Sequence, residues 1–248
     1  MTDAEARDDV SEGKIADSKD VVESLFSASI LTKFEIVSYR NAATVLASGF
    51  PEQFANINNA LEKFKISARM IREPGGSKGP IAKYVDGLFD ENWDEASIAA
   101  DLHVRLIHAK QKNKVLREYI REGYLDGHRI DFVNGKVALD LEWNSKDQTY
   151  DRDLYAFSAF YDAGAIDVGV ILTRGNSLDN DFFRSLGKVL NKDGTEGTDE
   201  VYKKFGASTT WMGKLLYRLD AGRNGGCPVL AIGIKPSCVT DWHGNVTV

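Results

Sequence analysis

The chain has 248 residues, of which 43% are apolar and 27% are charged. This composition is that of an ordinary globular protein and excludes collagen-like repeats, disulfide-rich scaffolds and wholesale disorder. No stretch approaches the roughly 20 consecutive apolar residues that a membrane-spanning helix needs, and the N-terminus lacks the pattern of a secretory signal. The protein is therefore expected in the cytoplasm, without contact with a membrane.

The acidic charge is concentrated at the N-terminus. The chain carries 31 basic and 37 acidic side chains, a net charge of −6, and residues 1–24 hold eight acidic against three basic ones. Residues 25–248 are therefore nearly neutral, which removes most of the force of an acidic pI as an argument against a nucleic-acid partner. We expect a flexible acidic extension over residues 1–24 and a single domain over residues 25–248.

The N-terminal half combines one strand with several helices. Residues 33–39 (KFEIVSY) alternate polar and apolar side chains, which predicts a strand. Short helices are expected over residues 21–31, 41–48, 50–66 and 82–93. The glycine-rich loop at residues 72–80 lacks the GxxxxGK[ST] pattern of a phosphate-binding loop.

Residues 94–122 are expected to form one long or broken helix that ends at Gly123. Their apolar side chains recur at a spacing that suits a helix face, at Ile98, Leu102, Leu106, Ala109, Leu116 and Ile120. Residues 103–129 also form a basic stretch, with seven Lys or Arg side chains against three acidic ones. Such a charge run is typical of a solvated helix face.

The C-terminal half alternates helices with buried strands. Helices are expected over residues 153–162 and 210–221, and apolar, β-branched strands over residues 166–172 and 229–234. This order indicates an α/β fold in which a β-sheet is flanked by helices. The two cysteines, Cys227 and Cys238, have no nearby histidine, so buried thiols are expected rather than a zinc site.

Residues 129–143 (RIDFVNGKVALDLEW) predict a β-hairpin. Asn134-Gly135 is the preferred dipeptide of a two-residue turn and would place Val133 opposite Lys136. Strand alternation then gives one wholly apolar face, made of Ile130, Phe132, Val137, Leu139, Leu141 and Trp143. The other face carries Asp131, Asp140 and Glu142, with the two aspartates as diagonal neighbours.

Three carboxylates on one face of a hairpin repel one another, and acids are poor strand formers. A divalent hard cation compensates this repulsion, and Mg²⁺ is usually held by one or two carboxylates. Bound Mg²⁺ makes water more acidic and neutralises charge on a phosphoryl group. We therefore interpret the face as a Mg²⁺ site. The alternative is a salt-bridged surface that faces solvent.

The spacing D-x8-D-x-E resembles the PD-(D/E)XK nuclease motif. The segments IDFVNGKVALDLEW, DRDLYAFSAFYDAGAIDVGVIL and STTWMGKLLYRLDAGRNGGCPVLAIGIKP resemble, in this order, the second half of type II restriction endonucleases of the BglII and BstYI group. The resemblance covers roughly residues 115–236. It implies a restriction-endonuclease-like core with a mixed sheet, and a homodimer that cuts double-stranded DNA at a palindrome with Mg²⁺ as cofactor. Because the relatives cut sites built on GATC, a GATC-containing palindrome is the expected substrate.

The resemblance also assigns catalytic roles. Asp131 matches the first metal-binding acid, and Asp140 matches the second, which is Glu in the relatives. Glu142 stands where most of the superfamily has Lys, the nearest relatives have Gln, and the more distant BamHI has Glu. We expect Glu142 to position or deprotonate the attacking water, with the Leu141 carbonyl as a possible further metal ligand.

Seven further residues are expected at the DNA. Two segments match family loops that contact DNA, namely Asn144, Ser145 and Lys146, and Ser208, Thr209 and Thr210. Small polar side chains suit hydrogen bonds to base edges and phosphates, although Ser and Thr before a helix are most often caps. Arg223 is either a phosphate contact or an ordinary loop arginine.

Two other functions remain open on the sequence alone. Asp140 and Glu142 form a carboxylate pair that a glycoside hydrolase could use, although the chain is short for a (β/α)8 barrel. The other alternative is a non-catalytic DNA-binding relative.

Overall fold

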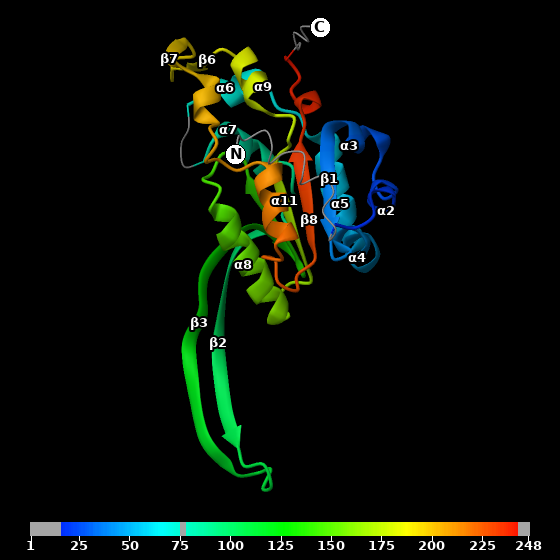
Figure 1. Ribbon diagram of the computed structural model, residues 1–248, viewed down its shortest axis with the longest axis vertical. Helices are drawn as coiled ribbons and strands as arrows, with labels where there is room; N and C mark the ends of the chain where they lie inside the picture. Colours follow the sequence, from blue (N-terminus) through cyan, green and yellow to red (C-terminus); the bar gives the residue numbers. More distant parts are fainter. Residues whose placement is uncertain (1–15, 75–77, 243–248) are drawn as a thin grey trace.

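A mixed β-sheet forms the centre of the computed structural model, which describes residues 16–74 and 78–242. Its strands are β1 (Phe34–Tyr39), β2 (Asp94–Ile107), β3 (Val115–Asn134), β4 (Val137–Glu142), β5 (Val168–Arg174) and β8 (Val229–Ile234). They are ordered β1-β8-β5-β4-β3-β2 across the sheet (Figure 1). β5 runs parallel to β4 and to β8, and the other neighbouring pairs are antiparallel. The expected α/β fold with a mixed sheet is confirmed.

Helices cover both faces of the sheet. On one face lie α8 (Thr149–Asp162) and α11 (Met212–Asp220). On the other face lie α2 (Lys19–Glu23), α3 (Ala28–Lys33), α4 (Ala42–Gly49), α5 (Pro51–Lys63) and α7 (Pro80–Asp86). The short helices α6 (Ala68–Arg72), α9 (Asn180–Ser185) and α10 (Val201–Lys204) add buried side chains to the same core, and α6 and α9 lie toward one end of the molecule (Figure 1). A small second sheet pairs β6 (Lys188–Leu190) with β7 (Glu196–Glu200), and a 3₁₀ turn, η2, spans Pro236–Cys238. β5 and β8 are buried along their whole length, as expected of strands covered on both faces.

Sequence periodicity explains the elements that were predicted correctly. In α11, the spacing of Met212, Leu215, Leu216 and Leu219 places all four on the face that packs against the sheet. The strands expected at residues 33–39, 166–172 and 229–234 correspond to β1, β5 and β8 within two residues at each end. Both cysteines are buried free thiols, as expected.

The helix expected over residues 94–122 is wrong. These residues form β2 and part of β3, a long two-stranded hairpin whose far end projects from the body (Figure 1). Positions four residues apart, such as Leu102 and Leu106, share a face on a strand as well as on a helix, so the spacing did not discriminate. Cross-strand pairing decided the outcome, with His103 opposite Ile120 and Arg105 opposite Glu118.

The turn of the β3–β4 hairpin is also shifted from the expected position. Asn134 pairs with Val137, so the turn residues are Gly135, with φ of 58°, and Lys136. The Asn134 side chain accepts a hydrogen bond from Gln53 of α5 at 2.9 Å, which engages it with the body instead of the turn. Phe132 consequently lies opposite Leu139, whereas the sequence predicted Val137.

The apolar face of this hairpin is confirmed except for Ile130. Phe132, Val137 and Leu139 pack with the N-terminal helices, but Ile130 packs on the opposite side of the sheet. The register between β2 and β3 shifts by one residue between the pairs Asp94–Val133 and Ala96–Ile130. A bulge adds one extra residue to one strand, so the Ile130 side chain beyond it points to the opposite face of the sheet.

Part of the acidic N-terminal segment is packed against the body. The Asp17 N–H donates to the Ser38 carbonyl at 2.8 Å, and Val22 of α2 is buried. Residues 1–15 of the expected flexible extension lie outside the described residues. Across residues 16–74 and 78–242, no helix is both long and apolar enough to span a membrane.

Candidate active site

The three carboxylates predicted as catalytic lie together where β3 meets β4. The Asp131 N–H donates to Asp140 Oδ1 at 2.9 Å, and the Leu141 N–H donates to Asp131 Oδ2 at 3.0 Å. Each aspartate therefore bonds to the strand that carries the other. Asp140 and Glu142 are only 5% and 6% exposed, because α8 covers this face of the sheet.

A fourth acid, which sequence reasoning missed, comes from α8. Asp153 is buried and hydrogen-bonds with Glu142. Arg152 is the nearest cation, with its guanidinium 2.9 Å from Asp153 Oδ1 and 3.8 Å from Glu142 Oε1. The signal in the sequence was an acid in the DRDLYAF helix that follows the hairpin, at the position one turn after Thr149.

Burial raises the pKa of these carboxyls. Desolvation is the largest cause for Asp131, Asp140 and Glu142, and it is reinforced at the latter two by the charge of Asp153. The pKa of Asp140 lies well above its ordinary value, and that of Glu142 is raised to about 8. The Leu141 N–H partly offsets the pKa shift at Asp131. The site thus gathers carboxyl groups whose ionised forms are disfavoured by burial and by one another, and a bound cation would favour those ionised forms.

An open cavity of about 940 Å³ lies against these carboxylates. Asp131, Leu141 and Glu142 line it, and so do Asn144 and Ser145 of the loop after β4. Its wall also includes cations that the sequence did not single out, namely Lys78, Arg129, Arg152 and Lys204. A cavity with an acidic floor and a cationic wall suits an anionic ligand that approaches a metal ion.

The acids fit a hard cation by their chemistry. Asp140 Oδ2 is buried and makes no hydrogen bond within the described structure, so one lone-pair-bearing oxygen in a desolvated site has no donor. Within the described ranges, no group of three or more His, Cys, Asp or Glu side chains is arranged to enclose a metal ion. Asp131 and Asp140 offer two carboxylates, which is the usual number for Mg²⁺ because it keeps several of its waters.

The two segments predicted to contact DNA lie side by side. Lys146 pairs with Thr209 in an antiparallel bridge, and the Thr210 N–H donates to the Ser145 carbonyl at 2.9 Å. Ser208 is exposed, whereas Thr210 is fully buried. These residues do not cap the following helix, because α11 starts after Trp211 without a side-chain cap.

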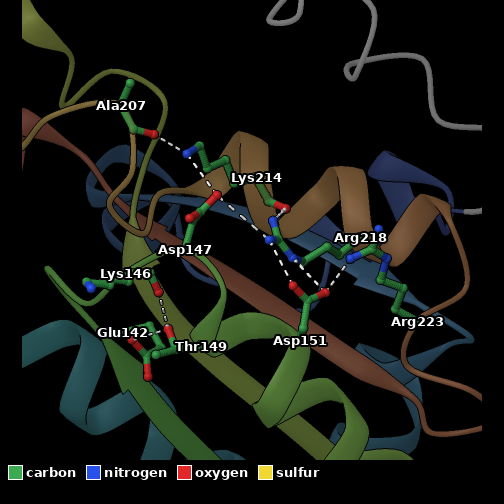
Figure 2. Close-up of polar contacts among 9 residues, drawn as sticks. All are labelled: Glu142, Lys146, Asp147, Thr149, Asp151, Ala207, Lys214, Arg218 and Arg223. Carbon is green, nitrogen blue, oxygen red and sulfur yellow. Dashed lines mark hydrogen bonds and ion pairs between the residues drawn. The ribbon is translucent and has the colours of Figure 1, made fainter.

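A network of ion pairs holds these segments on α8 and α11 (Figure 2). Lys214 of α11 bonds to the Ala207 carbonyl and, at 2.9 Å, to Asp147 Oδ2. The guanidinium of Arg218 donates one hydrogen bond to each carboxylate oxygen of Asp151, both at 3.0 Å. This is the bidentate geometry that makes Arg–carboxylate pairs strong.

Arg223 belongs to this network instead of the cavity. Its guanidinium pairs with Asp151 beside Arg218 (Figure 2), and 44% of its side chain is exposed. Thr149 links the network side of α8 to the acids, because its hydroxyl lies 3.2 Å from Glu142 Oε2 and 2.7 Å from the Lys146 carbonyl. The structure therefore places Asn144 and Ser145 at the cavity beside Asp131 and Glu142, and it pairs residues 208–210 with the segment 145–147. Arg223 lies apart from the cavity lining.

One family model matches most of the chain. The model described as restriction endonuclease BglII/BglIII covers residues 34–234. A search of the curated proteins gave no match.

The match contains all six strands of the central sheet, including the carboxylate hairpin, and both loops that follow β4 and precede α11. Because this family consists of DNA-cleaving enzymes, the match excludes the alternative of a glycoside hydrolase. Enzymes of this kind act on double-stranded DNA and generally use a divalent metal, which agrees with the acidic, cation-lined cavity. The chain belongs to the BglII/BglIII restriction endonuclease family and is a type II site-specific deoxyribonuclease with a PD-(D/E)XK core.

Proposed function

We propose that the enzyme works as a homodimer that cleaves both strands of a short GATC-containing palindrome with Mg²⁺ held by Asp131 and Asp140. The observation that carries the proposal is the pair of adjacent aspartates, in which Asp131 lines the cavity and buried Asp140 accepts a hydrogen bond from the Asp131 N–H. The metal would supply charge neutralisation at the phosphoryl group and acidification of water. The Leu141 carbonyl is the proposed further ligand.

Glu142 is proposed to orient or deprotonate the attacking water. It lines the cavity beside Asp131, and Thr149 and Asp153 hold its carboxylate in place. Fixed orientation of a water-binding group lowers the entropic cost of reaching the in-line geometry. Arg152, at the cavity wall, is placed to attract the phosphate backbone toward these groups.

Recognition is assigned to the paired loops. Asn144 and Ser145 line the cavity beyond the carboxylates, and Lys146, Ser208 and Thr209 lie next to them across the bridge. We propose that these five contact bases or phosphates, while buried Thr210 supports them through its backbone bond to Ser145. Arg223 is left out because Asp151 already holds its guanidinium.

Two-fold symmetry is the reason for the homodimer. A palindrome presents the same sequence on both strands, and each chain carries one carboxylate hairpin. Two copies related by a two-fold axis therefore match two half-sites and two scissile phosphates.

The test is digestion of two plasmids that differ only in whether they contain GATC palindromes. With Mg²⁺, discrete fragments are expected from the first plasmid and none from the second, and EDTA should stop cleavage. The Asp140→Asn protein is the matched control for a contaminating nuclease. Discrete cutting of the second plasmid would overturn the GATC assignment. DNA binding without cleavage would favour the non-catalytic alternative.

A further inference from the structure

Arg174, the last residue of β5, is a buried arginine that bonds to both segments assigned to DNA contact. It is 2% exposed. Its Nε–H is shared between the Trp143 carbonyl at 3.1 Å and the Thr210 carbonyl at 2.9 Å. One terminal nitrogen donates to the Thr209 hydroxyl at 2.6 Å. Because Trp143 directly precedes residues 144–146, one guanidinium joins the start of the first loop to the end of the second.

The charge of Arg174 is held without an acid among the described residues. Burial lowers the pKa of Arg174 to about 10, and no described carboxylate offsets this shift. The guanidinium carbon instead lies 5.3 Å from the ring centroid of Phe183 and 5.1 Å from that of Phe205, which is within the range of a cation–π contact. A buried charge costs free energy, and an apolar residue is often at least as stabilising in such a place. Core stability is therefore a poor reason for an arginine here.

The position of Arg174 in the sheet supplies a better reason. Glu142 of β4 lies beside Thr173 of β5 in the parallel register, and the Thr173 hydroxyl donates to the Glu142 carbonyl at 2.7 Å. Two consecutive side chains of β5, Thr173 and Arg174, thus hold two consecutive carbonyls at the end of β4. The strand that fixes the backbone of Glu142 is also the strand that fixes both loops.

We propose that Arg174 is a positioning residue that determines how strictly the enzyme selects its DNA sequence. It holds the two loops in a fixed relation to each other and to Glu142, so that base contacts and the attacking water are aligned together. Arg174 does not line the cavity beside the carboxylates, so it acts through the loops. The inference rests on the proposed assignment of residues 144–146 and 208–209 to DNA and names what sets their geometry.

Lysine cannot replace the arginine in this role. A guanidinium is a rigid planar fork that stacks on aromatic rings, whereas an ammonium is a compact point charge on a flexible stem. Arg174→Lys therefore keeps the charge and loses the simultaneous bonds to Trp143, Thr209 and Thr210. The loops should then occupy several arrangements, and a displacement of about 1 Å in a positioned group can cost about 10² in rate.

The experiment measures discrimination, which is the ratio of kcat/KM for the cognate duplex to kcat/KM for a duplex with one base pair of the site changed. The site is the one found by sequencing the ends of wild-type fragments, so the test does not depend on the GATC assignment. Both values scale with the amount of folded enzyme, so partial unfolding leaves their ratio unchanged. We expect Arg174→Lys to lower the ratio at least about 10-fold.

Val170→Ala is the matched control for lost stability. Val170 lies on the same strand, is fully buried, and pairs with Leu139 and Leu230 in the sheet. Its truncation leaves a cavity that lowers the melting temperature, and we expect discrimination to stay at the wild-type value. If Val170→Ala lowers the ratio as much as Arg174→Lys does, general loss of stability explains the effect and the inference is wrong.

The wild-type protein allows a second measurement that does not depend on how well a variant folds. The Arg174 Nε–H is held between two carbonyls in the core, so it should exchange slowly with solvent in ¹⁵N NMR spectra. With EDTA present to prevent cleavage, its signal should shift when the cognate duplex binds and stay in place with the changed duplex, because cognate contacts alone engage both loops. Fast exchange, or equal shifts with both duplexes, would overturn the inference.

Two loop variants separate this inference from the proposed recognition. Asn144→Ala and Ser208→Ala test the loops directly, and both should lower discrimination. If they do and Arg174→Lys does not, the role of Arg174 is wrong and the recognition role of the loops stands. If none of the three changes lowers the ratio, the proposed recognition role is wrong and the inference fails with it.

Discussion

The two ends of the β2–β3 hairpin differ in which side chains are exposed to solvent: the base buries charged groups, and the far end exposes apolar ones. At the base, Asp131 bonds to Asp140 in a site where burial raises the pKa of both carboxyls. At the far end, residues 101–125, which we call the arm, large apolar side chains such as Ile120 remain in contact with water. Burying charge and exposing apolar surface both cost free energy.

Each end of the hairpin lacks one kind of compensating contact within the described part of the chain. The base is covered by α8 and the N-terminal helices, so its carboxylates lose hydration, which the proposed cation would offset. Nothing else in the described part of the chain covers the arm, so its apolar side chains stay hydrated. The same two strands thus carry the candidate active site at one end and exposed apolar side chains at the other.

The largest expected effect is that of Asp140→Asn, which tests the base. The amide keeps an oxygen for the Asp131 N–H but removes charge from the proposed metal site. We expect cleavage to fall by at least on the order of 10²–10³. The metal-free protein should melt higher, by about 2–4 °C for each kcal/mol of relieved repulsion. Cleavage assays and thermal melts in EDTA measure both.

A lower melting temperature, with activity lost in proportion to unfolding, would show that Asp140 is structural. It would also remove the contrast between the charge-crowded base and the arm. Retained cleavage at the wild-type rate would place the active site elsewhere.

Glu142→Gln should be milder than Asp140→Asn. An amide at residue 142 can still orient a water and restores the residue type of the nearest relatives, whereas no nearby described group replaces the charge at residue 140. Rates across a Mg²⁺ titration should show measurable cutting by the Glu142→Gln protein. The Asp140→Asn protein should show none, or a much higher metal requirement. Equal loss in both would make Glu142 a required base or ligand.

Lys214→Met tests how the base is held. The change removes the ion pair with Asp147 and the bond to the Ala207 carbonyl that fasten the paired loops. We expect about 1 kcal/mol lower stability and weaker binding of cognate DNA, with the dimer unaffected. Denaturant melts and DNA titrations check this.

The matched control is Lys136→Met. Lys136 forms a more exposed pair with Asp167 at 3.5 Å, and such pairs contribute about 0–1 kcal/mol. If both variants weaken DNA binding equally, general charge loss explains the effect and the fastening role of Lys214 is wrong.

Arg223→Ala should have the smallest effect. Asp151 keeps its two bonds to Arg218, so we expect a stability change within about 0.5 kcal/mol. The salt dependence of DNA binding should stay the same, whereas a lost phosphate contact would lower its slope by about 1. A titration series in increasing salt distinguishes the two and decides whether Arg223 belongs to the DNA surface.

The local pattern of the sequence determined much of this protein. Period-two alternation around Asp131 and Asp140 separated an acidic face from an apolar one, and the spacing in α11 placed its leucines on the core. These features depend on backbone geometry that repeats over a few residues. The resemblance assigned residues 144–146 and residues 208–210 each to DNA contact, but only the structure showed that the two segments pair, since no local period joins segments so far apart.

Tertiary structure alone decided the remaining features. The β2–β3 arm replaced an expected helix, because a spacing of four residues suits both elements and only the pairing partner distinguishes them. Asn134 lies outside the turn and accepts a hydrogen bond from Gln53 of α5. A bulge beside Ile130 places that side chain on the other face of the sheet. Asp153 entered the site from α8, whose position depends on packing across the sheet. Such contacts join residues far apart in the chain, so they depend on the assembled core and not on any local pattern.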